Sequence, residues 1–600
     1  MCGIFGLVDF SAAPVKTGAF KKISTMLSRR GPDEEGIFIQ QDEDVSCAIL
    51  HRRLAIIDLH SGKQPMANED ESIILACNGE IYNYKEIRDN LIAKGHVFKT
   101  NSDSEVVLHA YEEYSTDCLT YFRGMFIFVI WDKNKQSLLI ASDRVGKKPL
   151  YYYIDNLKLV FSSELRCLLA YGEREPQVNR KAIYQYLSYC YVPAPETAFS
   201  EIYRLMPAEN IIFSDKKLIR NKYWHIDFSN KISISEKKAA EEIRKLVWES
   251  VKLRMISDVP VGVFLSGGLD SSIVTAVMTK ETPLPVETFS VGFEERDLNE
   301  LRYARLVQQY FNCNHNEVIM RAESFNRLPE LIEYFGQPHS DSSALATMLL
   351  AQEAKRKITV ALVGEGADEL FGGYWRYFYY RLGNMFNKIG LISNNMFRCR
   401  YKRWLGGFKE NLQKRIFTHD FFYDKEREDA DGDLFYLFTE ANKLRDIDAA
   451  LFVDTRFFLP YDLLNKLDVS TMAYGIEARA PFLDHKLMEF SASLPAKIKL
   501  KGFISKYILR EAFKNMLPSE ITQRKKTGFV VPVQSWFRNE LKDAARDILL
   551  SSSAKKRGYF NMKAIEEILN SHISGESNFG HEIWTLLVFE LWQRKFFDEN

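Results

Sequence analysis

The 600-residue chain has few cysteines, and none of them are arranged in pairs. Its eight cysteines show no CxxC spacing, which argues against a disulfide framework or a zinc site and fits a reducing compartment. Long apolar runs are also absent. The strongest, residues 125–131, is far too short to cross a bilayer, and no apolar segment follows a cationic start. We therefore expect a cytoplasmic protein with no membrane partner.

An excess of charge of either sign is missing too. Lys and Arg number 80, and Asp and Glu number 80, so net charge predicts no nucleic-acid partner. Residues 397–415 mix Arg, Lys and aromatics, a pattern more typical of a solvated helical face than of a nucleic-acid or membrane contact. With 46% hydrophobic residues, a chain of this length can form about two to four globular domains.

The first part of the chain alternates short strand patterns with turn residues. The predicted strands are residues 4–8, 73–77, 126–131, 137–142, 159–162 and 210–213. Apolar residues at helical spacing predict helices over 84–94 and 104–114, the second with Ser102 or Asp103 as its cap. This part is therefore an α+β layered structure, and it ends in a connector of polar turns between residues 205 and 236.

The second part alternates strands with helices. A helix is predicted over 236–255, and an apolar strand at 260–265 leads through a Ser-Gly-Gly turn into a helix at 273–279. Further strands at 286–293 and 358–363 predict a doubly wound parallel sheet, followed by a mainly helical C-terminal third. We place the two domains at 2–215 and 236–600.

The second residue has useful chemistry if the initiator Met1 is removed. Cys2 would then carry both a thiol and the α-amine, whose reference pKa of about 7.7–8.0 lets it accept the thiol proton near neutral pH. Taken alone, a cysteine near a terminus is more often incidental. The hypothesis of a terminal nucleophile therefore depends on the other motifs.

The turn at residues 266–272 reads Ser-Gly-Gly-Leu-Asp-Ser-Ser and lies between a strand and the start of a helix. Unpaired backbone N–H groups and the helix dipole favour an anion there. The turn lacks the lysine of a P-loop and the spacing of a dinucleotide fingerprint, but Asp270 offers an oxygen ligand for Mg²⁺. A lone turn of this kind is as often purely structural.

A second loop, residues 364–374, follows the strand that ends at Val363 and contains several carboxylates among glycines. Because the carboxyl ends of parallel strands share one edge of the sheet, Asp270 and Asp368 are expected to lie close enough to hold Mg²⁺ against a triphosphate. The alternative interpretation is a pair of solvated acidic loops.

Three segments of the first domain fit an amide-hydrolysing site. Asn78 and Gly79 can pair a side-chain amide with a backbone N–H, the two donors that an oxyanion hole requires. Residues 51–54 supply a cation and residues 101–103 an anion, which could hold the carboxylate and amine of an amino acid. Each segment alone is a common structural pattern.

Together these motifs resemble the glutamine-dependent asparagine synthetase family over nearly the whole chain. The resembling segments are residues 1–6, 30–33, 51–59, 64–66, 78–83, 142–151, 161–164, 191–195, 258–272, 288–293, 364–374, 477–485 and 506–511. The resemblance implies an N-terminal α+β glutaminase domain with Ntn-hydrolase-like layered sheets. It also implies an α/β doubly wound ATP-pyrophosphatase domain with a mainly helical C-terminal part.

At the first site, the resemblance implies that Cys2 attacks the side-chain amide of glutamine and that water later hydrolyses the thioester. Catalysis and glutamine binding there are assigned to Cys2, Arg53, Asn78, Gly79, Glu80 and Asp103. Arg53 and Asp103 would hold the backbone groups of glutamine. The ammonia released is expected to travel to the second site without contact with water.

At the second site, the resemblance implies that a substrate carboxylate, with aspartate favoured, attacks ATP to form an acyl-adenylate that ammonia then converts to an amide. ATP binding is assigned to Leu265, Ser266, Gly267, Gly268, Asp270, Ser271, Ser272, Val291, Val363 and Gly364. Mg²⁺ is assigned to Asp270 and Asp368, and Lys506 is expected to face the phosphate charge. Glu365 favours amide formation over the chemistry of the related β-lactam synthetases.

The sequence departs from the family pattern at three places. Val363 replaces the usual serine, Val469 replaces the cation that usually follows the Asp at 468, and residues 207–209 differ in the connector. The two valines are expected in the synthetase pocket, so another carboxylate, such as a sugar acid or a peptide, remains an alternative acceptor. A non-catalytic scaffold is a third reading, and a homodimer is left open as the quaternary structure.

Overall fold

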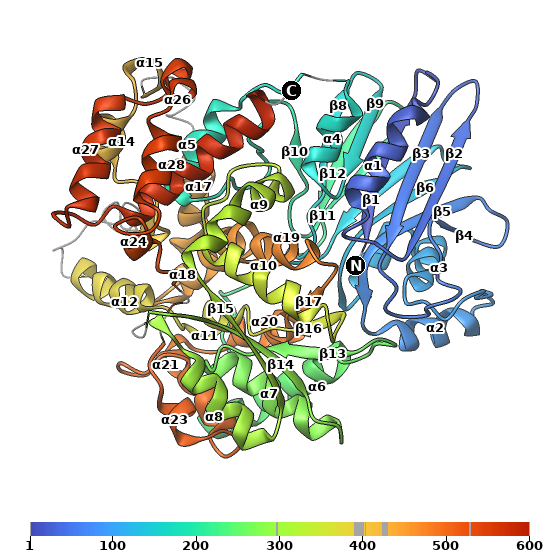
Figure 1. Cartoon of the computed structure of the whole chain (residues 1–600). Helices are drawn as coiled ribbons and strands as arrows, with labels where there is room; N and C mark the ends of the chain where they lie inside the picture. Colours follow the sequence, from blue (N-terminus) through green and yellow to red (C-terminus); the bar gives the residue numbers. More distant parts are fainter. Residues whose placement is uncertain are drawn as a thin grey trace.

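The computed structural model describes residues 2–173, 175–295, 298–388, 401–402, 404–422, 430–526, 528 and 530–598. The chain forms a sheet-rich N-terminal part and a larger part built on a second type of sheet (Figure 1). No helix among these residues is both apolar and long enough to cross a bilayer. All seven cysteines that are described are buried and free, so no disulfide joins them.

The N-terminal part contains two six-stranded sheets whose neighbouring strands all run antiparallel. The first has the order β10-β8-β9-β1-β3-β2, with β1 at Gly3–Asp9, β2 at Glu34–Gln41, β3 at Ser46–Arg53, β8 at Tyr151–Asp155, β9 at Lys158–Ser162 and β10 at Tyr203–Arg204. The second has the order β12-β11-β7-β6-β5-β4, with β4 at Met66–Ala67, β5 at Ile73–Ile81, β6 at Gly124–Asp132, β7 at Ser137–Ser142, β11 at Glu209–Ser214 and β12 at Lys217–Lys222.

The alternation of side chains along β1 explains how these sheets form layers. Ile4 and Val8 point to the second sheet and pack in one cluster with residues of β5 and β6. Phe5 and Leu7 point the other way and pack against α1 (Phe20–Leu27). Helices α2 (Tyr84–Ala93) and α3 (Glu105–Tyr114) cover the outer face of the second sheet. The result is the expected α+β layered fold of Ntn-hydrolase type, with helices outside two stacked sheets.

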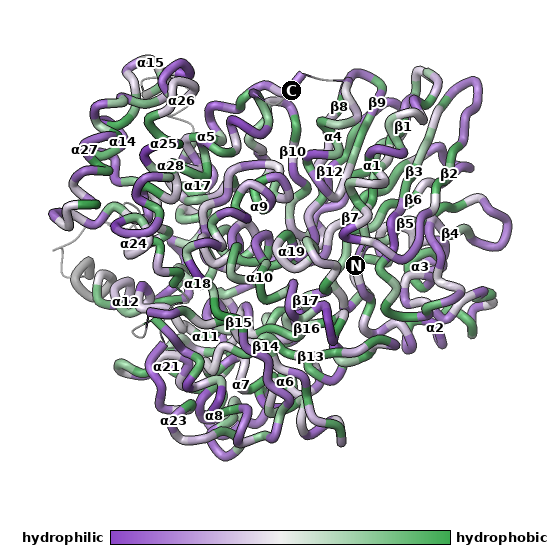
Figure 2. The backbone as a smooth tube through the Cα atoms, in the orientation of Figure 1, coloured by the Kyte–Doolittle hydropathy of each residue, from purple (hydrophilic) through white to green (hydrophobic). Residues whose placement is uncertain are grey.

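Figure 2 shows a hydrophilic loop beside β4. The last strand of the N-terminal part is β12, which pairs with β11. The next helix along the chain, α6, spans Glu236–Arg254.

The second part is built on a five-stranded sheet in which every neighbouring pair runs parallel. Its order is β15-β14-β13-β16-β17, with β13 at Val261–Phe264, β14 at Glu287–Phe293, β15 at Asn314–Met320, β16 at Val360–Leu362 and β17 at Glu477–Arg479. Helices α7 (Leu269–Glu281), α8 (Leu301–Phe311) and α10 (Ser343–Ala354) connect the strands. This confirms the doubly wound parallel sheet.

The remaining C-terminal part is mainly helical, as expected. Its described helices include α11 (Ala367–Phe371), α12 (Trp375–Lys388), α14 (Glu410–Ile416), α19 (Leu464–Met472), α22 (Tyr507–Phe513) and α28 (Gly580–Gln593). Within the basic and aromatic stretch 397–415, residues 397–400 and 403 lie outside the described residues. In α14, Lys414 and Arg415 are exposed while Ile416 is buried, which agrees with a solvated helical face.

Candidate active sites

Cys2 lies just before β1 and is only 6% exposed. Its backbone N–H donates a hydrogen bond of 2.9 Å to Asn78 Oδ1. The Asn78 side chain is fully buried on β5, and its Nδ2 has no hydrogen-bond partner in the described part of the chain. A buried amide donor without a partner is costly unless a ligand accepts from it. Asn78 therefore both orients Cys2 and keeps one N–H available beside the thiol.

The electrostatic surroundings of Cys2 leave its thiol protonated. Burial raises the pKa of the Cys2 thiol, and nearby Arg53 offsets this only in part. His51, on the adjoining strand β3, accepts no proton near neutral pH because burial lowers its pKa to about 4, and its Nε2 lies 3.0 Å from Cys77 O. His51 is therefore a weak base near neutral pH. Met1, whose removal we expect, lies outside the described residues.

Arg53 and Gly79, two further candidate residues of this site, are held by contacts with neighbouring strands. Arg53 Nη1 lies 2.8 Å from Glu34 Oε2, so the predicted cation is half of an ion pair. A Cβ on Gly79 would lie 2.1 Å from Met125 O, so only glycine lets the backbone of β5 approach β6 this closely. Both residues come from strands that also position Cys2 and Asn78.

Neither Ser102 nor Asp103 caps α3, so both of our predictions for its cap are wrong. The helix has Ser104 at its N-cap with no side-chain cap, and Asp103 Oδ2 instead accepts a hydrogen bond of 2.8 Å from Ile81 N, at the end of β5. Burial raises the pKa of Asp103 to about 6. The carboxylate is thus held next to the strand that carries Asn78 and Gly79.

Buried ion pairs connect the two parts of the protein beside Cys2. Arg479, on β17, lies 3.2 Å from Glu80 Oε1 on β5 and 2.6 Å from Glu477 Oε1. Arg30 Nη2 lies 2.9 Å from Asp468 Oδ2, and Arg30 Nε donates to Cys2 O over 3.2 Å. Glu80, predicted to bind glutamine, is therefore an interface residue.

Val469, next to Asp468, does not line the synthetase cavity, so our prediction for it is wrong. It packs in an apolar cluster and lines a separate small cavity with Arg30, Glu164 and Arg166. The helix α19 turns successive residues to different sides, so Asp468 meets Arg30 while the valine fills an apolar gap. The cation that the family usually has at position 469 would therefore lie at the interface between the two parts. Of the two valines that depart from the family pattern, only Val363 lines the synthetase cavity.

The predicted phosphate loop occupies the turn between β13 and α7. The helix begins at Leu269, four residues earlier than predicted, and its N-cap Gly268 offers no side-chain cap. Gly267 has φ +69°, and a Cβ there would lie 2.5 Å from Ala304 N, so both conformation and space require glycine. The free N–H groups at the start of this 13-residue helix are a binding place for an anion.

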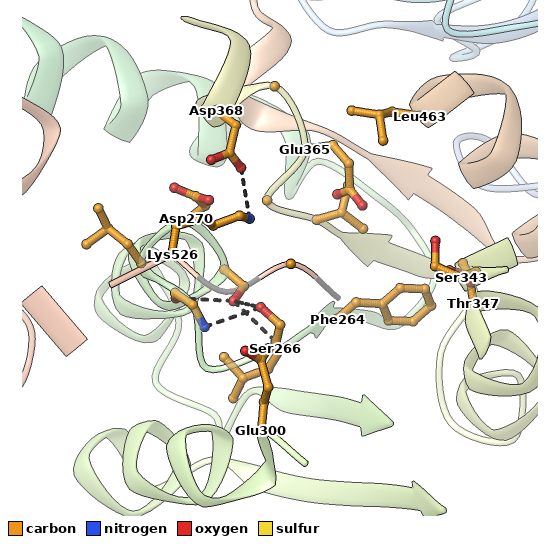
Figure 3. Close-up of a pocket in the computed structure, with 18 of the residues that line it drawn as sticks. Phe264, Ser266, Asp270, Glu300, Ser343, Thr347, Glu365, Asp368, Leu463 and Lys526 are labelled. Carbon is orange, nitrogen blue, oxygen red and sulfur yellow. Dashed lines mark hydrogen bonds and ion pairs between the residues drawn. The ribbon is translucent and has the colours of Figure 1, made fainter. Parts of the chain in front are cut away.

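This turn borders a cavity of about 360 Å³ at the carboxyl edge of the parallel sheet, shown in Figure 3. The predicted residues that line it are Leu265, Ser266, Gly268, Asp270, Ser271, Val291, Val363, Gly364, Glu365, Asp368 and Lys506. Gly267 and Ser272 do not line it. Ser272 Oγ donates to Gly268 O over 2.6 Å and so stabilises the first helical turn.

The two carboxylates predicted to bind Mg²⁺ meet in this cavity. Lys506 Nζ lies 2.6 Å from Asp270 Oδ2 and 2.7 Å from Asp368 Oδ1. Lys526 Nζ lies 3.0 Å from Asp368 Oδ2. Burial alone would raise the pKa of Asp368, but the two lysines outweigh it and hold the pKa at about 2. Burial dominates for Asp270 and raises its pKa.

Lys526 was not found in the sequence, although the run Arg524-Lys525-Lys526 was a signal for an anion site. Lys506 is the N-cap residue of α22 and has φ +52°, an uncommon conformation for a residue other than glycine. Its Nζ lies between the two carboxylates. Asp270 Oδ1 is buried and has no hydrogen-bond partner within the described ranges, so the carboxylate keeps an oxygen for a ligand.

Two charged residues that line the cavity, Lys466 and Asp341, were not predicted from the sequence. Lys466 Nζ lies 2.9 Å from Asp341 Oδ2 and donates to Ser343 Oγ over 2.9 Å. Glu365 lies on the same side, and burial raises its pKa although Lys466 lowers it in part. Glu369 accepts a hydrogen bond of 2.5 Å from the Tyr374 hydroxyl, and burial with neighbouring Asp368 raises its pKa to about 7.

The chain was compared with known families and proteins. Residues 242–594 match the asparagine synthase family model, and residues 1–224 match a glutamine amidotransferase domain. The chain is 35% identical to asparagine synthetase [glutamine-hydrolyzing] 1 of Bacillus subtilis, over 99% of this chain and 96% of that protein. It is 38% identical to a putative asparagine synthetase of Methanocaldococcus jannaschii, over 62% of this chain and 76% of that protein.

More distant relatives have other names. The chain is 26% identical to amidase chry2 of Gibberella zeae, over 95% of both chains. The matches at both ends of the chain, the coverage and the two sites lead to the same conclusion. This protein belongs to the glutamine-hydrolysing asparagine synthetase family, in which a glutamine amidotransferase domain precedes an ATP-using asparagine synthase domain.

Proposed function

We propose that this enzyme converts aspartate to asparagine, with glutamine as nitrogen donor and ATP as the source of activation. One observation carries the proposal. The cavity joins two charge sets, the carboxylates and lysines at the phosphate loop and the Lys466, Asp341 and Glu365 set opposite them. The first suits a nucleotide triphosphate and the second a small zwitterion. The free, buried cysteines support a reducing compartment such as the cytoplasm.

At the first site, the α-amine exposed by loss of Met1 takes the proton of the Cys2 thiol, and the sulfur attacks the amide carbon of glutamine. Asn78 Nδ2 and the Gly79 backbone N–H stabilise the oxyanion. Breaking the carbon–nitrogen bond releases ammonia and leaves a thioester. Water then hydrolyses the thioester to give glutamate and free Cys2. Asp103, held beside β5, would bind the ammonium group of glutamine.

At the second site, the phosphates of ATP lie over the start of α7, where backbone N–H groups are free. The acceptor carboxylate attacks the α-phosphorus, pyrophosphate leaves, and an acyl-adenylate forms. Ammonia attacks its carbonyl carbon and displaces AMP. In the first of these two steps, Lys506 and Lys526 stabilise the charge that develops on the leaving pyrophosphate.

The residues at the phosphate loop also fit Mg²⁺. Asp270 Oδ1 is a buried oxygen with no hydrogen-bond partner in the described segments. Asp368 contacts Lys506, the lysine that also contacts Asp270. Mg²⁺ is usually bound by a few protein carboxylates together with phosphate oxygens. When bound, Mg²⁺ would neutralise phosphate charge and align the triphosphate.

The acceptor end favours an amino acid. Lys466 could pair with the α-carboxylate of aspartate, while Asp341 or Glu365 could pair with its ammonium group. The alternative, another carboxylate, is favoured by Val363, which lines the cavity where the family usually has a hydroxyl.

A substrate panel tests this proposal. Pyrophosphate release from ATP should be measured with glutamine and, in turn, aspartate, glutamate, a sugar acid and a peptide carboxylate, and the amide product should be identified by mass spectrometry. We expect aspartate to exceed every other acceptor by at least tenfold. A higher kcat/KM for another carboxylate would replace aspartate and leave the two-site chemistry in place. Fully active enzyme that retains Met1 would refute the role of the terminal amine.

A further inference from the structure

A cluster of two histidines and two glutamates lies on the outer side of the N-terminal part, outside both sites described above. We call it the His/Glu cluster: Glu69, His96, His109 and Glu112. One ligand atom from each of Glu69, His96 and His109 falls within 4.8 Å of the others. Glu69 follows β4, His96 follows α2, and the other two residues lie on α3.

The inner distances of the cluster resemble a tetrahedral metal site. Glu112 Oε2 lies 3.4 Å from His96 Nδ1 and 3.3 Å from His109 Nδ1, and Glu69 Oε2 lies 3.8 Å from His109 Nδ1. Ligands at about 2.0–2.2 Å from one tetrahedral zinc ion are about 3.3–3.6 Å apart. Two of these three distances lie within that range, and the third is slightly longer.

Each histidine also has an outer carboxylate beside its second nitrogen. His96 Nε2 lies 3.3 Å from Glu113 Oε2, and His109 Nε2 lies 3.6 Å from Glu105 Oε1. Glu105 is itself fixed by hydrogen bonds from Lys99 N and Thr100 N. A carboxylate behind the imidazole is the usual support of a metal-binding histidine, since it fixes the ring and its tautomer.

Burial makes the cluster more than a surface group of charges. The His109 side chain is 1% exposed, whereas the Glu69 side chain is 37% exposed. Glu69 Oε1 accepts from Val97 N over 3.0 Å, which leaves Oε2 directed to His109. The site thus has a buried histidine at its base and one side open for an ion to enter.

A protonated histidine with acidic neighbours is the alternative explanation of these distances. Four carboxylates surround the two rings, and Lys94 Nζ lies 2.7 Å from Glu113 Oε1. A divalent cation would offset this negative charge as fully as a proton on each of the two rings, so metal titration is what separates the two explanations. Imidazole with carboxylate is a ligand set that suits zinc and similar transition metals.

We propose that the His/Glu cluster is a binding site for a divalent transition metal of the zinc class. The ion would tie together the loop after β4, the turn after α2 and the helix α3. Because Asp103 precedes α3 by two residues, the metal would also fix the segment that carries this carboxylate. The role is structural, and it does not depend on which acceptor the synthetase uses.

Metal titration of the full-length, metal-free enzyme tests the proposal. With Co²⁺ as spectroscopic probe, we expect one equivalent to bind with visible bands of tetrahedral geometry and without a thiolate charge-transfer band. Zn²⁺ should displace it and raise the Tm. His96→Ala and Glu112→Gln should each weaken Co²⁺ binding at least tenfold and abolish the rise in Tm.

His225→Ala is the matched control, because this histidine is exposed and lies outside the cluster. Its Co²⁺ binding should equal that of the wild type. Circular dichroism of the apo variants checks that each is folded, and Glu112→Gln keeps nearly the same shape if His96→Ala fails. Equal binding in wild type and in both cluster variants, a thiolate band, or no stoichiometric binding would each overturn the proposal.

Discussion

The two candidate active sites are built in opposite ways. Around Cys2, the important groups lie on neighbouring antiparallel strands, and a single 2.9 Å hydrogen bond joins the nucleophile residue to Asn78. In the synthetase cavity, the carboxylates stand at the edge of a parallel sheet, but the lysines that neutralise them come from residues 506 and 526. The first site is fixed by its sheets, while the second is completed by lysines at a helix start and in an irregular segment of the C-terminal part.

This difference predicts how the sites fail. A strand-fixed site with a dedicated nucleophile should lose its reaction entirely when one atom is removed, without effect on the other site. A site of opposed charges should weaken by degrees, because each group shares its role with a neighbour. The following predictions test this contrast, from the largest expected effect to the smallest.

Cys2→Ala should reduce glutamine-dependent synthesis by more than about 10⁴-fold, since no other group can form the thioester. Ammonium-dependent synthesis should stay within about twofold of wild type, because the synthetase cavity is separate. The measurement is product formation with each nitrogen donor at saturating ATP. Equal loss with both donors would mean that the sites do not act independently.

Asp270→Asn should reduce pyrophosphate release by about 10²–10³-fold with either nitrogen donor, the size expected when one charged group at a transition state is lost. The substitution keeps the shape of the side chain but removes the charge that faces Lys506. Glutamine hydrolysis, measured as glutamate release in the same samples, serves as the internal control. Near-normal pyrophosphate release would remove Asp270 from the metal site.

Lys526→Met should have a smaller effect, about 10–100-fold on pyrophosphate release, since Lys506 still contacts both carboxylates. Lys514→Met, at a largely exposed lysine paired with Glu511, is the matched control and should leave the rate unchanged. A loss as large as that of Asp270→Asn would show that the lysines do not share their role.

Much of this contrast was predictable from the sequence, because local patterns determine it. Strands β1, β5, β6, β7, β9, β11, β13, β14 and β16, the Ser-Gly-Gly turn and the loop at 364–374 follow from residues close together in the chain. The N-terminal strands β2, β3, β4, β8, β10 and β12 were not predicted. Neither were β15, which reads Asn-His-Asn-Glu at its start, and the three-residue β17. A polar edge strand and a very short one lack the apolar run on which strand prediction rests.

The residues that were missed are those placed by packing between distant segments. Lys526, Lys466 and Asp341 enter the cavity from helical or irregular regions with no local motif. Val469 was misplaced for the same reason, because the side of α19 that it occupies depends on which surface meets the N-terminal part. Motif position predicts that a residue matters, but only the packed structure decides which site it serves.

The smallest expected effect concerns the pH dependence of glutamine binding. Burial raises the pKa of Asp103 to about 6, so its carboxylate is charged above that pH and neutral below it. Lowering the pH from 7 to 5 should therefore raise the KM for glutamine by up to about tenfold, as one charge-assisted hydrogen bond to the substrate ammonium is lost. Asp103→Asn should show the high KM at both values, while the terminal amine affects kcat in both enzymes alike. If the variant keeps the same pH profile of KM as the wild type, Asp103 does not bind glutamine, and the first site is held by Arg53 and the strand donors alone.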